Sequence, residues 1–181
     1  MRQAKRYTTA YKKKVDVERD MYLEKRRPKG IRRCAGCGAV YYRHHWALAA
    51  PPQTEKRAEL RPRRAVLCPA CRKIRDGYPG GELRIATPPA REKGDILRIV
   101  RNEEKRAREK NPLERIMSIE TDGPTGWKIH TTTEKLAQRL GRRLRKALGG
   151  AVDYRWSHNN KFVRVVWREA VKKRQEGRMR T

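Results

Sequence analysis

Four cysteines are the residues whose type and spacing point most directly to chemistry. They form two C-x-x-C pairs, Cys34 with Cys37 and Cys68 with Cys71, separated by thirty residues. Each pair can bend over one metal ion, and together they supply the four thiolates of a tetrahedral zinc site. Four sulfurs close such a site and leave no open position for a substrate, so the spacing predicts one structural zinc ion rather than a catalytic one.

The alternative reading of the cysteines is two disulfides or free thiols. The first thirty residues contain no apolar stretch that would serve as an export signal. We therefore expect a reducing, cytoplasmic environment, in which disulfides are disfavoured. Arg32, Arg33, Arg72 and Arg75 flank the two pairs and would offset the negative charge of a tetrathiolate zinc site.

A dense aromatic and basic run, YYRHHW, lies between the two cysteine pairs at residues 41–46. It could stack on RNA bases, because aromatic rings accept any base and the adjacent arginine can hold a phosphate. It could equally be a small core packed against the zinc site. Alternation along a strand would allow both, with one face inward and one outward.

The same region suggests an enzymatic alternative. A C-x-x-C-G motif, a histidine pair, a proline-containing loop and L-C-x-x-C resemble zinc-braced HNH nucleases, in which His44 and His45 would be the catalytic candidates. No aspartate precedes the histidine pair, and no asparagine stands in the loop before Cys68. A hydrolytic metal would therefore lack ligands, and we expect no enzymatic activity.

Composition points to a polyanionic partner. The 181 residues carry 48 Lys and Arg against 20 Asp and Glu, for a net charge of +28, and only 36% are hydrophobic. The longest apolar run is far too short for a membrane span, which needs about 20 residues. A chain this positive repels itself until a polyanion neutralises it, so nucleic acid is the expected partner and a membrane is not.

The charge is unevenly distributed and suggests four segments. Residues 92–132 carry nine cations and eight anions, whereas residues 133–181 carry fifteen cations and four anions. We assign residues 1–30 to a basic N-terminal arm and residues 31–91 to a zinc module with an arginine-rich loop. Residues 92–168 form an α+β RNA-binding domain and residues 169–181 a basic tail. Both termini have the composition of disordered segments that become ordered on a partner.

Apolar periodicity predicts the elements of the later part of the chain. A short strand at residues 82–87 precedes a helix, two strands, a second helix and two final strands. These elements span residues 91–111, 114–121, 127–132, 133–149, 152–156 and 162–167. The order αββαββ predicts an antiparallel sheet with helices on one face. The fold class is therefore α+β, with a four-cysteine zinc ribbon or treble-clef module in front.

Two basic surfaces of this domain are candidate RNA contacts. One is the helix at residues 133–149, which contains no acid between Lys135 and Asp153, and the other is the last hairpin. We expect the tryptophans to lie in the core, and we treat His130 and His158 as non-catalytic. The candidate RNA-binding residues of the whole chain are Lys12, Lys13, Lys14, Arg26, Arg27, Arg32, Arg33, Tyr42, Arg43, His44, His45, Trp46, Arg61, Arg63, Arg64, Arg72, Lys73, Arg139, Arg142, Arg143, Arg145, Lys146, Arg155, Arg164 and Arg168.

The CAGCG and CPAC knuckles, followed by TTTEKLAQRLGRRLRKALGGAVDYRW and FVRVVW, resemble the Nmd-three family of zinc proteins. These proteins bind the large ribosomal subunit as its maturation and export adaptor. Short bacterial proteins with one zinc module and the same helix–hairpin end are more similar still. The resemblance covers about residues 31–168. It implies the metal role of the four cysteines and a ribosomal partner, the large subunit in particular.

We therefore expect a monomeric, non-enzymatic zinc protein that binds rRNA on the ribosome, with ribosomal proteins as further contacts. Its role would be that of a hibernation or stress factor, or of an assembly factor, that occupies functional sites. The alternatives are the HNH-like nuclease and a DNA-binding regulator. For the latter, the sequence offers neither a recognition helix nor a dimer seam.

Overall fold

The computed structural model of the chain describes residues 20–22, 30–49, 52, 66–86, 93–123, 126–157 and 162–169. The first folded unit contains the small strands β1 (Arg32–Arg33), β2 (Val40–Tyr42) and β3 (His45–Ala47), followed by helix α2 (Pro69–Arg75). The three strands form one antiparallel sheet in the order β1-β2-β3. A hairpin followed by a helix that starts at the second cysteine pair is the treble-clef form of the predicted zinc module.

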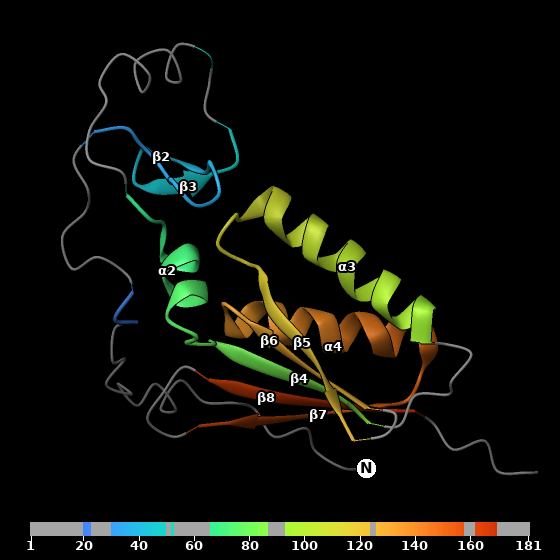
Figure 1. Cartoon of the computed structure of the whole chain (residues 1–181). Coiled ribbons are helices and arrows are strands. Elements are labelled where there is room, and N and C mark those ends of the chain that lie inside the picture. The colour runs from blue at the N-terminus through green and yellow to red at the C-terminus, as the bar shows by residue number, and fades with distance from the viewer. Residues whose placement is uncertain are drawn as a thin grey trace, which may run out of the picture.

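The second unit is a five-stranded sheet with two helices. Its elements are β4 (Gly81–Ala86), α3 (Lys93–Lys110), β5 (Ile116–Asp122), β6 (Gly126–Thr131), α4 (Glu134–Leu148), β7 (Ala151–Trp156) and β8 (Val163–Arg168). Figure 1 shows α4 lying on one face of the sheet and α3 packed beside α4. The predicted α+β class, element types and placement of the helices are confirmed.

Two details of the sheet differ from the prediction. The strand order is β5-β6-β4-β8-β7, and β4 pairs antiparallel with β6 but parallel with β8. The sheet is therefore mixed rather than wholly antiparallel. We expected the zinc module to extend to residue 91 and the α+β domain to begin after it. β4 lies before that boundary, yet it is the central strand of the five-stranded sheet. Its partners begin more than forty residues further along the chain, beyond the reach of local patterns.

The core of this unit lies between the sheet and α4. Leu136, Leu140 and Leu144, which recur every four residues along α4, are fully buried, and Leu148 packs against the same core. Thr133 begins the helix because its side-chain oxygen accepts a hydrogen bond from the Leu136 amide at 3.2 Å. The helix therefore buries one face by its leucine spacing and leaves the other face to solvent.

The turn after α4 requires glycine. Gly149 and Gly150 have φ angles of 77° and 81°, in the left-handed region that other residues avoid. The Trp167 indole donates to the Gly149 carbonyl at 2.9 Å. A methyl group on Gly150 would lie 2.2 Å from the Arg168 carbonyl oxygen. This turn sends the chain directly from α4 into β7.

No helix in the described part of the chain is both long and apolar enough to cross a lipid bilayer.

Candidate metal centre and basic surface

The fold brings the four cysteines together at one point. Cys34 and Cys37 lie in the turn between β1 and β2, and Cys68 and Cys71 lie at the start of α2. Their four Sγ atoms lie within 4.8 Å of one another. The Cys37 and Cys68 sulfurs are 3.7 Å apart, and all four thiols are free. The two pairs therefore form a single cluster that could hold one metal ion, and they do not form disulfides.

Backbone N–H groups are directed at the sulfurs. The Cys68 amide donates to the Cys34 sulfur at 3.2 Å, and the Cys71 amide donates to the Cys68 sulfur at 3.4 Å. Burial raises the pKa of Cys34, but amide donors from Cys68, Gly36 and Cys37 outweigh burial and leave its pKa at about 7. These hydrogen bonds stabilise thiolates, which are the form that binds a metal.

The thiols of the second pair, Cys68 and Cys71, have pKa values above the ordinary value of a cysteine when no metal is bound. Burial raises the pKa of Cys71 to about 11, and it raises the pKa of Cys68 as well. Neighbouring sulfurs add to both shifts, because charges of the same sign repel at this distance. A divalent cation would remove this repulsion, so the cluster is chemically suited to a metal ion.

A cation from the α+β unit reaches the cluster, and sequence reasoning missed it. Arg115, between α3 and β5, donates from Nη1 to the Cys71 sulfur at 3.2 Å. Leu113 packs against the buried residues around the cysteines. Arg115 follows Cys71 by 44 residues, and no spacing rule links the two positions. Such outer hydrogen bonds to ligand atoms tune metal sites.

The cations predicted beside the cysteines occupy different environments. Arg33 is exposed, and Arg32 is half-buried. Arg72 donates to the Tyr22 carbonyl. Arg75 pairs with Asp76 on the surface and lowers the pKa of that carboxyl, chiefly through a hydrogen bond. None of these four makes the sulfur contact that Arg115 makes, within the part of the chain described here.

Lys73 is not a surface residue, contrary to its inclusion among the candidate RNA contacts. It is 6% exposed. Its ammonium group lies 2.6 Å from the Asp20 carboxylate and donates to the Thr132 carbonyl at 3.1 Å. The Lys73 side chain projects from the face of α2 that is turned toward the sheet unit, where it meets the Thr132 carbonyl. Lys73 therefore joins the zinc module to the α+β unit.

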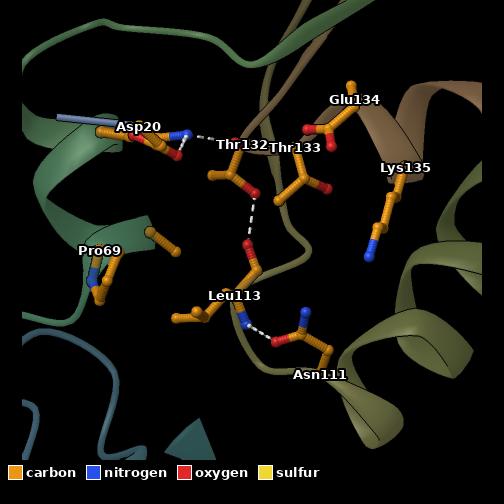
Figure 2. A pocket seen from close by; sticks show the side chains of 10 residues that line it. Asp20, Pro69, Asn111, Leu113, Thr132, Thr133, Glu134 and Lys135 are labelled. Carbon is orange, nitrogen blue, oxygen red and sulfur yellow. Dashed lines mark hydrogen bonds and ion pairs between the residues drawn. The ribbon is translucent and has the colours of Figure 1, made fainter. Parts of the chain in front are cut away.

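A cleft of about 250 Å³ marks the same junction. Figure 2 shows it between Pro69 of α2, Leu113 of the loop before β5 and Lys135 at the start of α4. The Thr132 hydroxyl donates to the Leu113 carbonyl at 2.6 Å, which ties the walls together. The cleft is smaller than typical ligand pockets of about 300–1,000 Å³, and we interpret it as the joint between two units.

The aromatic run between the cysteine pairs divides between inside and outside. Tyr41 is buried, and Trp46 is half-buried with its ring centroid 5.4 Å from that of Tyr41. Tyr42 is half-buried and packs on the exposed His45. The inward residues thus form a small core, and Tyr42 and His45 lie on the other face of the hairpin.

Arg43 and His44 form the exposed two-residue turn of this hairpin. Their φ angles are 45° and 69°. Two-residue hairpins favour turns with positive φ, but they usually place Asn-Gly there because side chains are strained in that conformation. His44 and His45 belong to no group of three metal-ligating side chains among the described residues. The hairpin presents a cationic tip at a local cost in backbone energy.

The arginines of α4 fall into two groups. Arg139 is half-buried and pairs with Glu103 at 3.3 Å and with the buried Glu114 at 3.2 Å, so it links α4 to α3 and the following loop. Arg142, Arg145 and Lys146 are exposed and Arg143 is half-buried. None of these four has an ion-pair partner among the described residues. The outer face of α4 therefore carries unbalanced positive charge.

The last hairpin also presents cations. Arg155 and Arg164 are exposed and face each other across β7 and β8. Arg168 is exposed and pairs with Asp153. Trp167 is fully buried as expected for a core residue, but Trp156 is 54% exposed, which corrects its predicted place in the core.

His130 is less isolated than the sequence suggests. It lies on β6 with its Nε2 3.5 Å from Glu82 and its Nδ1 3.6 Å from Glu120. Ser118 donates to Glu120 at 2.7 Å, so its hydroxyl proton is already engaged. These contacts place His130 in a polar cluster on the open face of the sheet.

The remaining candidate residues lie outside the described residues. These are Lys12, Lys13, Lys14, Arg26, Arg27, Arg61, Arg63 and Arg64. The same holds for His158 and for most of both terminal arms.

Fold and site together define an α+β protein with a four-cysteine metal-binding module attached to a sheet unit whose covering helix is basic. No protein-family model, curated protein or solved structure matches the chain.

Proposed function

We propose that this protein is a non-enzymatic, zinc-stabilised RNA-binding protein that associates with the ribosome through rRNA. The observation that carries the proposal is the outer face of α4. Arg142, Arg145 and Lys146 are exposed there without a carboxylate partner among the described residues. Unbalanced cations on a rigid helix are the electrostatic footprint of a phosphate-binding surface.

The cysteine cluster supports zinc as the metal. Four sulfurs at about 2.3 Å from one zinc ion are roughly 3.8 Å from each other, and the Cys37 and Cys68 sulfurs are 3.7 Å apart. Cys34, Cys37, Cys68 and Cys71 would hold the ion, and Arg115 would offset part of the resulting negative charge. Zinc with four thiolates has no open position, so it stabilises the module.

The cationic hairpin tip supports nucleic acid as the partner. Arg43 and His44 keep a backbone conformation that Asn-Gly would adopt at lower cost. A strained, exposed turn that carries an arginine is more consistent with a binding role than with stability. The resemblance to the Nmd-three family favours the large ribosomal subunit, with a role in hibernation, stress or assembly, in the cytoplasm.

The decisive experiment compares two triple variants with the same loss of charge. Arg142→Ala/Arg145→Ala/Lys146→Ala removes three exposed cations of α4 that have no ion-pair partner among the described residues. The control, Arg98→Ala/Arg101→Ala/Arg106→Ala, removes α3 cations that pair with Asp95, Glu104 and Glu103. Binding to rRNA fragments and co-sedimentation with ribosomal subunits are measured between 50 and 200 mM salt.

We expect wild-type affinity to fall by about 10³–10⁵ across this range, as for ~6–10 phosphate contacts. The α4 variant should lower the slope of log affinity against log salt by up to about three, and the α3 variant should change it little. Wild-type protein that stays at the top of the gradient at low salt would contradict the proposal. Preferential binding of duplex DNA, or metal-dependent cleavage abolished by His44→Ala, would favour the regulator or the nuclease.

A further inference from the structure

Two exposed aromatic residues on β7 have no part in the fold's core. Tyr154 is 39% exposed and Trp156 is 54% exposed. β7 is an edge strand, paired only with β8 in the described sheet. Burying a large aromatic side chain stabilises a protein. Two such side chains that remain exposed on one strand therefore indicate a binding role.

The register shows which face of the sheet they share. Tyr154 pairs with Val165, and Trp156 pairs with Val163. Both valines are fully buried in the core beneath α4. Directly paired residues of antiparallel strands lie on the same face, so both aromatic side chains point to the side of the sheet that carries α4.

α4 covers the start of β7 but not its end. Gly141 makes the close approach, because a methyl group added there would lie 2.6 Å from Val165 Cγ1 and 3.3 Å from Val152 Cγ1. Val152 is half-buried, whereas Tyr154 and Trp156 further along β7 are exposed. The result is an aromatic ledge, made of Tyr154 and Trp156, beside a helix.

Exposed cations lie on both faces of the sheet in this unit. Arg142 and Arg145 are exposed on α4, which lies on the same side of the sheet as the ledge. Arg155 lies on the opposite face of β7, across from Arg164. Arg145, Arg155 and Arg164 are all exposed. Cations around open aromatic rings match a ligand that combines phosphates with flat bases.

We infer that Tyr154 and Trp156 form a stacking site for two neighbouring unpaired nucleobases of RNA, with the exposed cations of α4 on the same side of the sheet to hold the RNA backbone. Residues two apart on a strand are roughly 6.7 Å apart, and their rings project from one face, as in sheet surfaces that stack two or three bases. This inference deepens the proposed function and rests on it, because it specifies single-stranded segments as the ligand.

The test uses the full-length, zinc-loaded protein and two probes, a 12-nucleotide single-stranded RNA and a duplex containing the same strand. Trp156→Ala and Tyr154→Ala are compared with Tyr78→Ala, which removes an aromatic side chain of similar exposure, 42%, outside the ledge. Trp156→Thr, which retains strand propensity, and Trp156→Phe, which retains a ring, separate stacking from folding. Urea unfolding of each variant verifies that the sheet remains intact.

Each alanine variant should weaken single-strand binding by about 5- to 150-fold, since stacking contributes ~1–3 kcal/mol per base. Trp156→Thr should behave like Trp156→Ala, and Trp156→Phe should retain most of the affinity. Duplex binding and the salt slope should not change, because duplex bases are already stacked and no charge is removed. Tyr78→Ala should bind both probes like wild type.

Different failures have different meanings. If wild-type protein binds the single strand and Trp156→Ala binds it equally well, the stacking site is wrong and the proposed function stands. If wild-type protein binds neither probe nor ribosomes, the proposed function itself fails. Loss of ribosome co-sedimentation with unchanged oligonucleotide binding would make the ledge a contact for a ribosomal protein and overturn the inference.

Discussion

Arg115 of the α+β unit donates a hydrogen bond to the sulfur of Cys71 in the zinc module, with 3.2 Å between nitrogen and sulfur. Lys73 makes the reverse connection from α2 to the Thr132 carbonyl. The two units are therefore joined through one cysteine of the candidate metal site and one buried lysine. We therefore expect occupancy of the metal site and docking of the module onto the sheet to be coupled.

The first prediction concerns Arg115. Arg115→Ala should weaken zinc binding by about 10–100-fold, because it removes a charge-bearing donor to a ligand sulfur. Arg115→Lys should have a smaller effect, since it keeps the charge. Competition with a chromogenic chelator measures the affinity, with Arg98→Ala on the exposed face of α3 as the control. Equal affinities of wild type and Arg115→Ala would show that the contact does not tune the metal.

Metal removal should unfold the zinc module and spare the sheet. The module has few buried hydrophobic residues of its own, namely Cys34, Ala39, Val40, Tyr41, Cys68 and Ala70, whereas the sheet unit has a continuous core of thirteen. Small modules of this kind depend on their metal for folding. Hydrogen exchange after chelation should lose protection in β2 and β3 and retain it in β4 and β8. Cys68→Ser should reproduce that pattern, and loss of protection in all four strands would contradict it.

Metal affinity should rise with pH. The pKa values of Cys68 and Cys71 lie above their ordinary value, at about 11 for Cys71, so both thiols are protonated at pH 7 without metal. Zinc must displace these protons, and acid favours their return. Calorimetry in buffers of different ionisation enthalpy should therefore detect at least two protons released per zinc bound at pH 7. Fewer than two would mean that the thiols are already ionised.

Two arginines on α4 should respond differently to alanine. Arg139→Ala leaves the buried Glu114 carboxylate without its guanidinium partner, which should lower the free energy of unfolding by about 1–3 kcal/mol. Arg142→Ala removes an exposed, unpaired cation and should leave stability within about 0.5 kcal/mol. Urea unfolding measures both. Arg142→Ala should instead weaken RNA binding at low salt. If Arg142→Ala lowers stability and Arg139→Ala affects only RNA binding, the roles we assign to these two residues are wrong.

Gly150 should be intolerant of a side chain. Gly150→Ala combines a φ of 81° with a methyl group 2.2 Å from the Arg168 carbonyl oxygen, so the free energy of unfolding should fall by more than about 1 kcal/mol. Gly94→Ala in α3 is the matched control, because nothing lies within 4 Å of the added methyl group. That variant should be neutral or stabilised by up to about 1 kcal/mol. Thermal or urea denaturation distinguishes the two cases.

Local patterns were sufficient for the helices and strands of the α+β unit and for the cysteine cluster. The leucine spacing of α4 and the alternation in β8 are signals within one element, and the structure places both elements within one residue of the expected ranges. The two C-x-x-C pairs determine the cluster because each pair constrains its own turn. The charge bias was likewise evident, since counting residues requires no coordinates.

Long-range pairing decided the rest. The sequence does not show that β4 lies between β6 and β8, that Arg115 reaches Cys71, or that Lys73 and Arg139 are engaged in ion pairs. It also does not distinguish the buried Trp167 from the exposed Trp156, which belong to neighbouring strands of similar composition. Each of these outcomes depends on which surfaces meet after the chain folds. A residue type sets what a side chain can do, and its tertiary neighbours determine whether it is free to do so.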